Sequence, residues 1–236
     1  MENLLFLHGW GGDENSFASV LPYFRTKYNC VCVKMPREIS DTPSSAPRLP
    51  PLYLKGELPR EMKVVWDLDD YADYVIAELD KLEIKKTHII AHSFGARVAV
   101  LLVTKQPERF GKLVLTGPAG IRPRLGLWRR LRVRLHKLGL VASRGSADYR
   151  ELSPAGKKTF QNIVNRDLSA EIARIENPTL VIWGARDRAI KKTSVKRWTK
   201  LQRGVILKTY RRAGHFCFLD EPARFIVDAE EFLNAE

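Results

Sequence analysis

This sequence of 236 residues has few cysteines, no long apolar run and no start that resembles a leader. The three cysteines, Cys30, Cys32 and Cys217, are odd in number, and the first two are too close in sequence for a useful bridge. We therefore expect reduced thiols and a cytoplasmic protein. No stretch of about 18 apolar residues occurs, so a membrane-spanning helix is not expected. The first residues, M-E-N-L-L-F-L-H, have an acidic start and a short apolar run, unlike a signal peptide.

Charge is the part of the composition that calls for an explanation. The chain has 40 Lys and Arg against 27 Asp and Glu, a net charge of +13. Residues 121–158 carry a net +9 and residues 186–212 a net +10, so the rest of the chain is net −6. High basicity can indicate nucleic acid, an anionic membrane surface or an acidic partner. Two segments, rather than the whole body, are the candidates for such contacts.

Short apolar runs recur along the chain and predict strands; the run at 29–34 alternates, and those at 3–8 and 87–91 are expected to be buried. Each is rich in β-branched or aliphatic residues and ends at glycine, proline or a polar residue. They cover residues 3–8, 29–34, 87–91, 112–118, 178–184 and 204–210. Between them, apolar residues at helical spacing predict helices, including one that begins at Asp13 or Asn15 and runs to about Lys27, and one over residues 67–82. Strands that alternate with helices predict a mostly parallel six-stranded sheet with helices on both faces.

The spacing of the strands is irregular at one place. About sixty residues separate the strands at 112–118 and 178–184, and they include the helical pattern W-R-R-L-R-V-R-L-H-K-L at 128–138. We therefore predict an α/β core formed by residues 1–118 and 176–236, with a helical cap inserted at 119–175. A proline-rich loop at 36–60 has no predicted role.

The segment I-I-A-H-S-F-G-A at 89–96 carries the clearest chemical signal. A buried strand runs into a small-x-Ser-x-Gly turn and then directly into a helix, which is the context of a nucleophile elbow. Such a turn projects the Ser93 hydroxyl above the sheet, and Ala91 and Gly95 are small enough to let strand and helix approach. The alternative is that Ser93 only caps the helix.

A serine needs a positioned base to act as a nucleophile at neutral pH. Of the five histidines, His215 follows the last strand in A-G-H-F, where this topology brings a loop back over the edge that carries Ser93. Asp187 follows the preceding strand and is placed to orient the imidazole. His8 is expected to stabilise its turn, and His92 either lines the pocket or has a structural role.

Four motifs now stand in order: H-G-W-G-G at 8–12, A-H-S-F-G at 91–95, W-G-A-R-D at 183–187 and A-G-H-F at 213–216. In these motifs and their order the chain resembles the α/β-hydrolase superfamily over nearly its whole length, although Ala91 replaces a more usual glycine and the chain starts at the strand that the family counts as its third. The resemblance implies an α/β-hydrolase fold with a catalytic triad of Ser93, Asp187 and His215. It also implies an oxyanion hole formed by the backbone N–H groups of Trp10 and Phe94.

A carboxylic ester or thioester is the expected substrate, cleaved through an acyl-enzyme on Ser93 without a metal or organic cofactor. A C–C bond hydrolase, a lactonase or an acyltransferase would use the same triad, and a non-catalytic protein that binds a ligand or a membrane remains the alternative from another class.

The basic cap segment at 125–141 has an apolar face of Trp128, Leu131, Leu135 and Leu138, surrounded by arginines. It is expected to pack over the active site, with Trp128 and His92 as candidate substrate contacts. An anionic membrane surface or an acidic carrier protein is the alternative partner of its arginines, which would make the protein peripheral to the membrane. No nucleic-acid-binding motif accompanies the charge, so nucleic acid is not expected.

Overall fold

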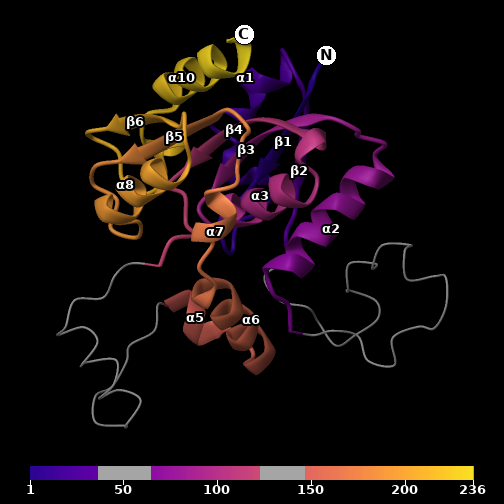
Figure 1. Ribbon diagram of the computed structural model, residues 1–236, viewed down its shortest axis with the longest axis vertical. Coiled ribbons are helices and arrows are strands. Elements are labelled where there is room, and N and C mark those ends of the chain that lie inside the picture. Colours follow the sequence, from indigo (N-terminus) through magenta and orange to yellow (C-terminus); the bar gives the residue numbers. More distant parts are fainter. Residues whose placement is uncertain (37–64, 123–146, 236) are drawn as a thin grey trace.

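The computed structural model describes residues 1–36, 65–122 and 147–235. Within these ranges six strands form one sheet, and each overlaps one of the predicted apolar runs (Figure 1). The edge strand at 206–210 is largely exposed, with its Ile206 and Leu207 facing solvent. The strands are β1 (Asn3–Leu7), β2 (Asn29–Val33), β3 (Thr87–His92), β4 (Phe110–Thr116), β5 (Thr179–Gly184) and β6 (Ile206–Tyr210). Their order is β2-β1-β3-β4-β5-β6, and every neighbouring pair is parallel. The predicted α/β-hydrolase fold with a six-stranded sheet is confirmed.

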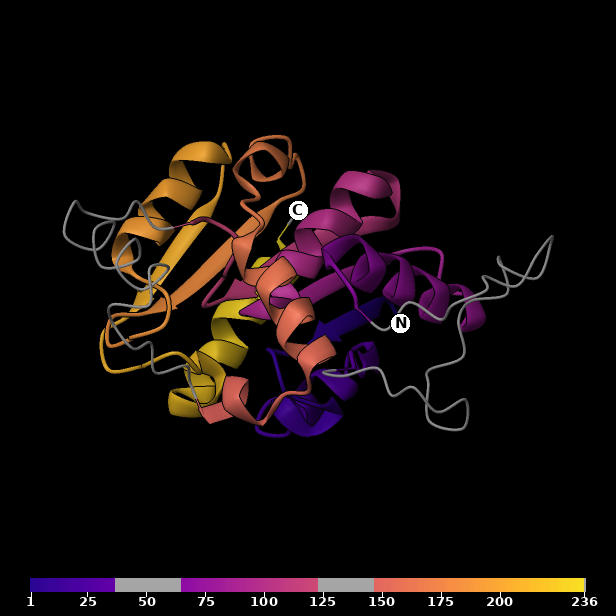
Figure 2. The ribbon, with the colours of Figure 1, turned by 90° about the horizontal axis from the view of Figure 1, so that it is seen from below.

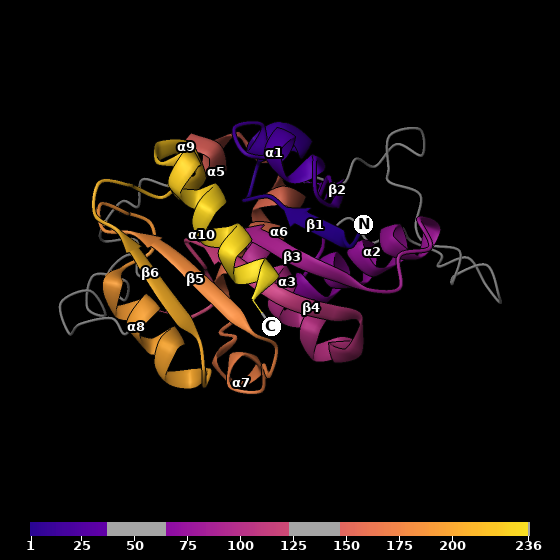
Figure 3. The ribbon, with the colours of Figure 1, turned by 90° about the horizontal axis from the view of Figure 1, so that it is seen from above.

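Helices cover both faces of the sheet, as predicted. Alternate residues of a strand point to opposite faces, so Leu5 and Leu7 belong to one apolar cluster and Leu4 and Phe6 to the other. The first cluster is shared with α2 (Leu68–Lys81), α3 (Phe94–Lys105), α7 (Ser169–Ile172) and α8 (Lys192–Leu201). The second is shared with η1 (Glu14–Phe17), α1 (Leu21–Arg25), α9 (Cys217–Asp220) and α10 (Pro222–Asn234) (Figure 3).

The helix expected from Asp13 to about Lys27 is broken in two. Asp13 does cap it, since its side chain accepts the N–H of Asn15 at 2.9 Å. The first piece, η1, ends at Phe17, and α1 starts again at Leu21 with Pro22 in its first turn. Proline has no N–H to donate and its ring clashes with the preceding turn. The single-helix prediction was wrong because Pro22 allows a helix to begin there and not to continue through it.

In the described part of the predicted cap, three helices follow β4: α5 (Ala147–Glu151), α6 (Pro154–Asn165) and α7. Helix α6 lies across the carboxyl edge of the sheet near the N-terminal turn (Figure 2), and its Phe160 ring packs 5.4 Å from the ring of Trp10. In contrast, Leu168 and Ile172 at α7 are fully buried in the core. The cap boundaries at 119 and 175 stay a prediction. A further short helix among the described residues is η3 (Pro107–Arg109), which leads into β4.

Candidate active site

Ser93 occupies the turn between β3 and α3 in a conformation that few residues adopt. Its φ is 49° and its ψ is −103°, in a chain where Glu83 is the other described non-glycine residue with positive φ. Such backbone conformations cost of order 1–3 kcal/mol and persist where the surroundings impose them. The surroundings are visible here: the N–H of Ser93 donates to the carbonyl of Thr116 at 3.1 Å, and the N–H of Ala119 donates to the carbonyl of Ser93 at 3.4 Å.

Gly95 lets helix α3 approach the sheet. A Cβ at this position would lie 2.2 Å from the carbonyl oxygen of Leu7 and 2.8 Å from that of His8. The small residue that the sequence motif requires is therefore a packing requirement against the backbone of β1. Because α3 starts at Phe94, the N–H of Phe94 lies in the first turn and has no partner within the helix.

Asp187 and His215 come together at the carboxyl edge of the sheet. The Nδ1–H of His215 donates to Oδ2 of Asp187 at 2.8 Å. The other oxygen, Oδ1, accepts the N–H groups of Ala189 at 2.7 Å and Ile190 at 2.9 Å. Burial by itself would raise the pKa of the Asp187 carboxyl, but these hydrogen bonds outweigh it and hold the pKa below its usual value. Asp187 therefore stays ionised and fixes the tautomer of His215, leaving Nε2 as the proton acceptor.

Gly117 connects the surroundings of Ser93 with those of His215. Gly117 follows Thr116, whose carbonyl holds Ser93, and it has a φ of +51°. A Cβ on Gly117 would lie 3.0 Å from Nδ1 of His215, so a side chain here would displace the imidazole. Sequence reasoning missed Thr116 and Gly117; the Gly-Pro turn after a buried strand was the available signal.

The turn after β1 completes this edge. Gly12 donates its N–H to the carbonyl of Gly9 at 3.0 Å, and a Cβ at Gly9 would lie 3.8 Å from the Cβ of Ser93. The indole of Trp10 packs edge-on against the Phe94 ring at 5.4 Å. Both residues predicted to supply the oxyanion hole therefore border Ser93, and the role of their N–H groups stays a prediction.

His92 and His8 are buried and held neutral. His92 donates Nδ1–H to the Thr116 carbonyl at 3.1 Å, and its ring lies 4.6 Å from that of His215. Burial, with a smaller contribution from His215, lowers the pKa of His92 to about 3. His8 donates Nδ1–H to the carbonyl of Gly9 at 2.7 Å and accepts the N–H of Met35 at 2.9 Å, so it stabilises its turn.

A pocket of about 230 Å³ adjoins this site. It is lined by His92, the 9–12 turn and the rings of Phe216 and Phe218. His92 thus lines a pocket, as one of its two predicted roles requires. Trp128 and the basic cap segment at 125–141 lie outside the described residues, as does most of the proline-rich loop.

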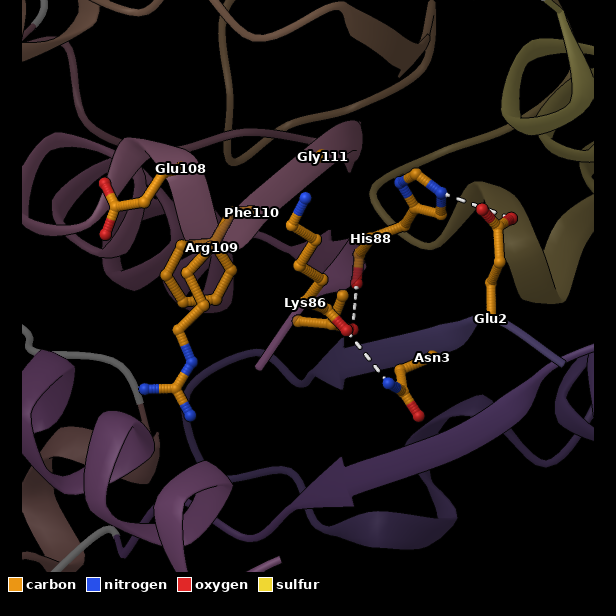
Figure 4. Close-up of a pocket in the computed structure, with 9 residues that line it drawn as sticks. Glu2, Asn3, Lys86, His88, Glu108, Arg109, Phe110 and Gly111 are labelled. Atoms are coloured by element: carbon orange, nitrogen blue, oxygen red, sulfur yellow. Dashed lines mark hydrogen bonds and ion pairs between the residues drawn. The ribbon is translucent and has the colours of Figure 1, made fainter. Parts of the chain in front are cut away.

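A second pocket, of about 440 Å³, lies at the opposite, amino edge of the sheet (Figure 4). His88 and Arg109, which line it, are engaged locally: Nε2 of His88 lies 3.5 Å from Glu2, and its Nδ1 accepts the N–H of Lys112 at 2.9 Å. The guanidinium of Arg109 donates to the carbonyl of Ile84, and it forms an ion pair with Asp80 at 2.7 Å. This pocket contains no serine, cysteine or base that is placed to attack a substrate, so we assign the chemistry to the carboxyl edge.

The described residues offer neither a metal site nor a membrane span. No group of three or more His, Cys, Asp or Glu side chains in these ranges is placed to hold a metal ion. No helix in the same ranges is both long enough and apolar enough to cross a bilayer.

Comparison with known proteins agrees with this geometry. A model of the alpha/beta hydrolase family matches residues 4–229. A strigolactone esterase of Pisum sativum is 28% identical over 114 residues, 48% of this chain and 38% of that protein. An uncharacterized hydrolase of Bacillus subtilis is 22% identical over 263 residues, 99% of this chain and 90% of that protein. A solved meta-cleavage product hydrolase from Pseudomonas fluorescens has a TM-score of 0.72 at 20% identity, with 99% of this chain and 91% of that chain covered.

Proposed function

Because the chain belongs to the alpha/beta hydrolase family, we propose that it is a serine hydrolase that cleaves a carboxylic ester or thioester through an acyl-enzyme on Ser93. The observation that carries the proposal is the strained Ser93 turn beside an Asp187–His215 pair joined at 2.8 Å. A serine that only capped α3 would accept a hydrogen bond from the helix, and the Ser93 side chain makes no such bond.

In the first half-reaction, Nε2 of His215 takes the proton of the Ser93 hydroxyl as Oγ attacks the substrate carbonyl carbon. The carbonyl oxygen becomes an anion, and the N–H groups of Trp10 and Phe94 stabilise it. Donors of this kind typically contribute about 3 kcal/mol each to lowering the barrier. When the tetrahedral intermediate collapses, His215 returns the proton to the leaving oxygen or sulfur, and the acyl group stays on Ser93.

In the second half-reaction, His215 removes a proton from water, which attacks the acyl-enzyme carbonyl. Collapse releases the carboxylic acid and returns the proton to Ser93. Asp187 remains ionised throughout and stabilises the imidazolium that forms in each half. His92 stays neutral beside His215, so no second positive charge repels the proton that His215 takes up.

The test is a panel of p-nitrophenyl esters with the acyl chain varied in length, assayed with the wild type and with Ser93→Ala. We expect turnover by the wild type and a loss on the order of 10⁶-fold in kcat for the variant, as for the removal of other triad nucleophiles. Asp187→Asn should lose roughly 10⁴-fold, because the wrong imidazole tautomer is then favoured. Equal turnover by the wild type and Ser93→Ala, or no turnover of any ester by folded wild type, would contradict the proposal.

A further inference from the structure

Four exposed arginines lie on the two loops that carry Asp187 and His215. They are Arg186, Arg188, Arg211 and Arg212, here called the arginine rim. The loops are joined by hydrogen bonds: the N–H of Ala185 donates to Tyr210 at 2.8 Å, and the N–H of Arg186 donates to Ala213 at 3.0 Å. Both follow paired strands, β5 and β6, whose carboxyl ends lie side by side (Figure 3). The rim is therefore one surface beside the catalytic edge.

The rim has no carboxylate partner in the described part of the chain. None of its side chains forms an ion pair or hydrogen bond there, whereas Arg166 and Arg109 each pair with an aspartate. Two acids near these loops are already used: Asp187 binds His215, and Asp220 of α9 accepts the N–H of Gly214 at 2.7 Å. Four like charges on adjoining loops create a positive potential that attracts anions.

The backbone beneath the rim is held in place by the catalytic aspartate. Oδ1 of Asp187 accepts two N–H groups of its own loop, and the indole N–H of Trp183 donates to Ile190 at 3.0 Å. The loop that carries Arg186 and Arg188 thus starts from an ordered backbone. A charged group on an ordered loop loses less entropy on binding than one on a free chain.

We propose that the arginine rim binds an anionic group of the substrate, so that the preferred substrate is an ester or thioester with a carboxylate or phosphate outside the reacting bond. The inference rests on the proposed function. Guanidinium groups bind both anions through paired N–H donors, and their charge does not titrate in the physiological range.

The test compares matched anionic and neutral esters. One pair is the p-nitrophenyl monoester of glutaric acid and p-nitrophenyl pentanoate, and the other is monobutyryl glycerol phosphate and monobutyryl glycerol. The rim variant replaces all four arginines by glutamine. The control variant replaces Lys85, Lys86, Lys200 and Arg203 by glutamine, which removes the same charge from exposed positions at the amino edge of the sheet.

The readout is the ratio of kcat/KM for the anionic ester to that for its neutral partner. At about 0.01 M salt the wild-type ratio should exceed one by roughly tenfold, and it should fall towards one at about 1 M salt, where charges are screened over about 3 Å. The rim variant should have a ratio near one at low salt, and the control variant should keep the wild-type ratio. Carboxylate and phosphate are distinguished by which pair shows the larger ratio.

The inference is overturned by a wild-type ratio near one at low salt, or by an equal loss in rim and control variants, which would indicate net charge alone. Binding of monobutyryl glycerol phosphate to Ser93→Ala, with and without the rim substitutions, reports on the rim without turnover. If the wild type hydrolyses neither ester but binds the anion in a rim-dependent manner, the proposed function is contradicted and anion binding by the rim is supported. If binding of the anion is the same with and without the rim substitutions, anion binding by the rim is contradicted, whether or not the esters are hydrolysed.

Discussion

The backbone at Ser93 stores strain that its neighbours must hold. The φ of 49° is maintained by the Thr116 carbonyl on one side and by the close approach of α3 to β1 on the other. Residues in such conformations depend on contacts that leave no room for adjustment. Gly95 provides the closest of these contacts, so it is where the turn should be most sensitive to an added methyl group.

Gly95→Ala should destabilise the fold by about 3 kcal/mol, at the upper end of the usual cost of overpacking, because the new Cβ meets backbone and not a side chain that could move. Urea unfolding measures the loss. The matched control is Gly214→Ala, whose Cβ would lie 3.5 Å from Asp220, an ordinary contact, and whose effect should stay within about 0.5 kcal/mol. Equal stabilities for the two variants would contradict the packing account.

Protonation of His92 makes the free energy of unfolding depend on pH. In the folded protein its pKa of about 3 lies below the ordinary histidine value of 6.5. Between these two pH values the unfolded chain binds a proton at His92 and the folded chain does not. Stability is therefore complete above about pH 6.5 and falls as the pH drops towards 3.

Between about pH 7 and pH 5, His92 should cost the wild type about 2 kcal/mol of its unfolding free energy. His92→Gln retains a donor for the Thr116 carbonyl and cannot titrate, so its stability should fall by that much less over the same range. His8 and His88, whose pKa values burial also lowers, titrate in both proteins and cancel from the difference. Urea unfolding at both pH values tests this, and parallel losses in the two proteins would show that His92 is not the group responsible.

At the scale of elements, the cap is tied to the nucleophile helix. Arg97, one turn into α3, is buried and donates Nη1–H to the carbonyls of Ile163 at 2.9 Å and Arg166 at 3.0 Å, at the end of α6. The last carbonyls of a helix have no partner within it and attract a cation. Burial lowers the pKa of Arg97 to about 10, which still leaves it charged at neutral pH.

Arg97→Met should keep much of the packing and lose both hydrogen bonds, at a cost of about 2 kcal/mol. The amides of α6 should then exchange with solvent roughly 30-fold faster than in the control Arg174→Met, which alters an exposed arginine. Hydrogen exchange followed by mass spectrometry reads this out. Unchanged exchange in α6 would mean that other contacts, such as Trp10 with Phe160, hold the cap.

The sequence was informative about elements wherever the signal was local. Buried strands were predicted from apolar runs, and parallel pairing followed from their alternation with helices. The break before α1 is also a local signal, since Pro22 favours the first turn of a helix. The contacts of Thr116 and Arg97 were not available, because each joins residues that are distant in the chain and depends on how the elements pack.

At the scale of the whole molecule, basic residues that contribute to the net charge of +13 lie at both edges of the sheet. Four cations of the 186–212 segment form the rim beside the site, while Lys200 and Arg203 lie at the opposite edge. The other basic segment lies mostly outside the described residues, so its membrane or carrier-protein contact stays a prediction. Ser93, Asp187 and His215 lie at one edge because each follows a strand, and the carboxyl ends of parallel strands meet at the same edge of the sheet.

The most direct test of the account is the mass of the intact protein after reaction with a fluorophosphonate, followed by peptide mapping. The account predicts a single adduct per chain on Ser93 in the wild type. The control Ser194→Ala, which replaces a serine of α8, should label equally, and Ser93→Ala should not label. Folded wild-type protein that remains unlabelled, or an adduct that persists in Ser93→Ala, would contradict the assignment of Ser93 as the nucleophile.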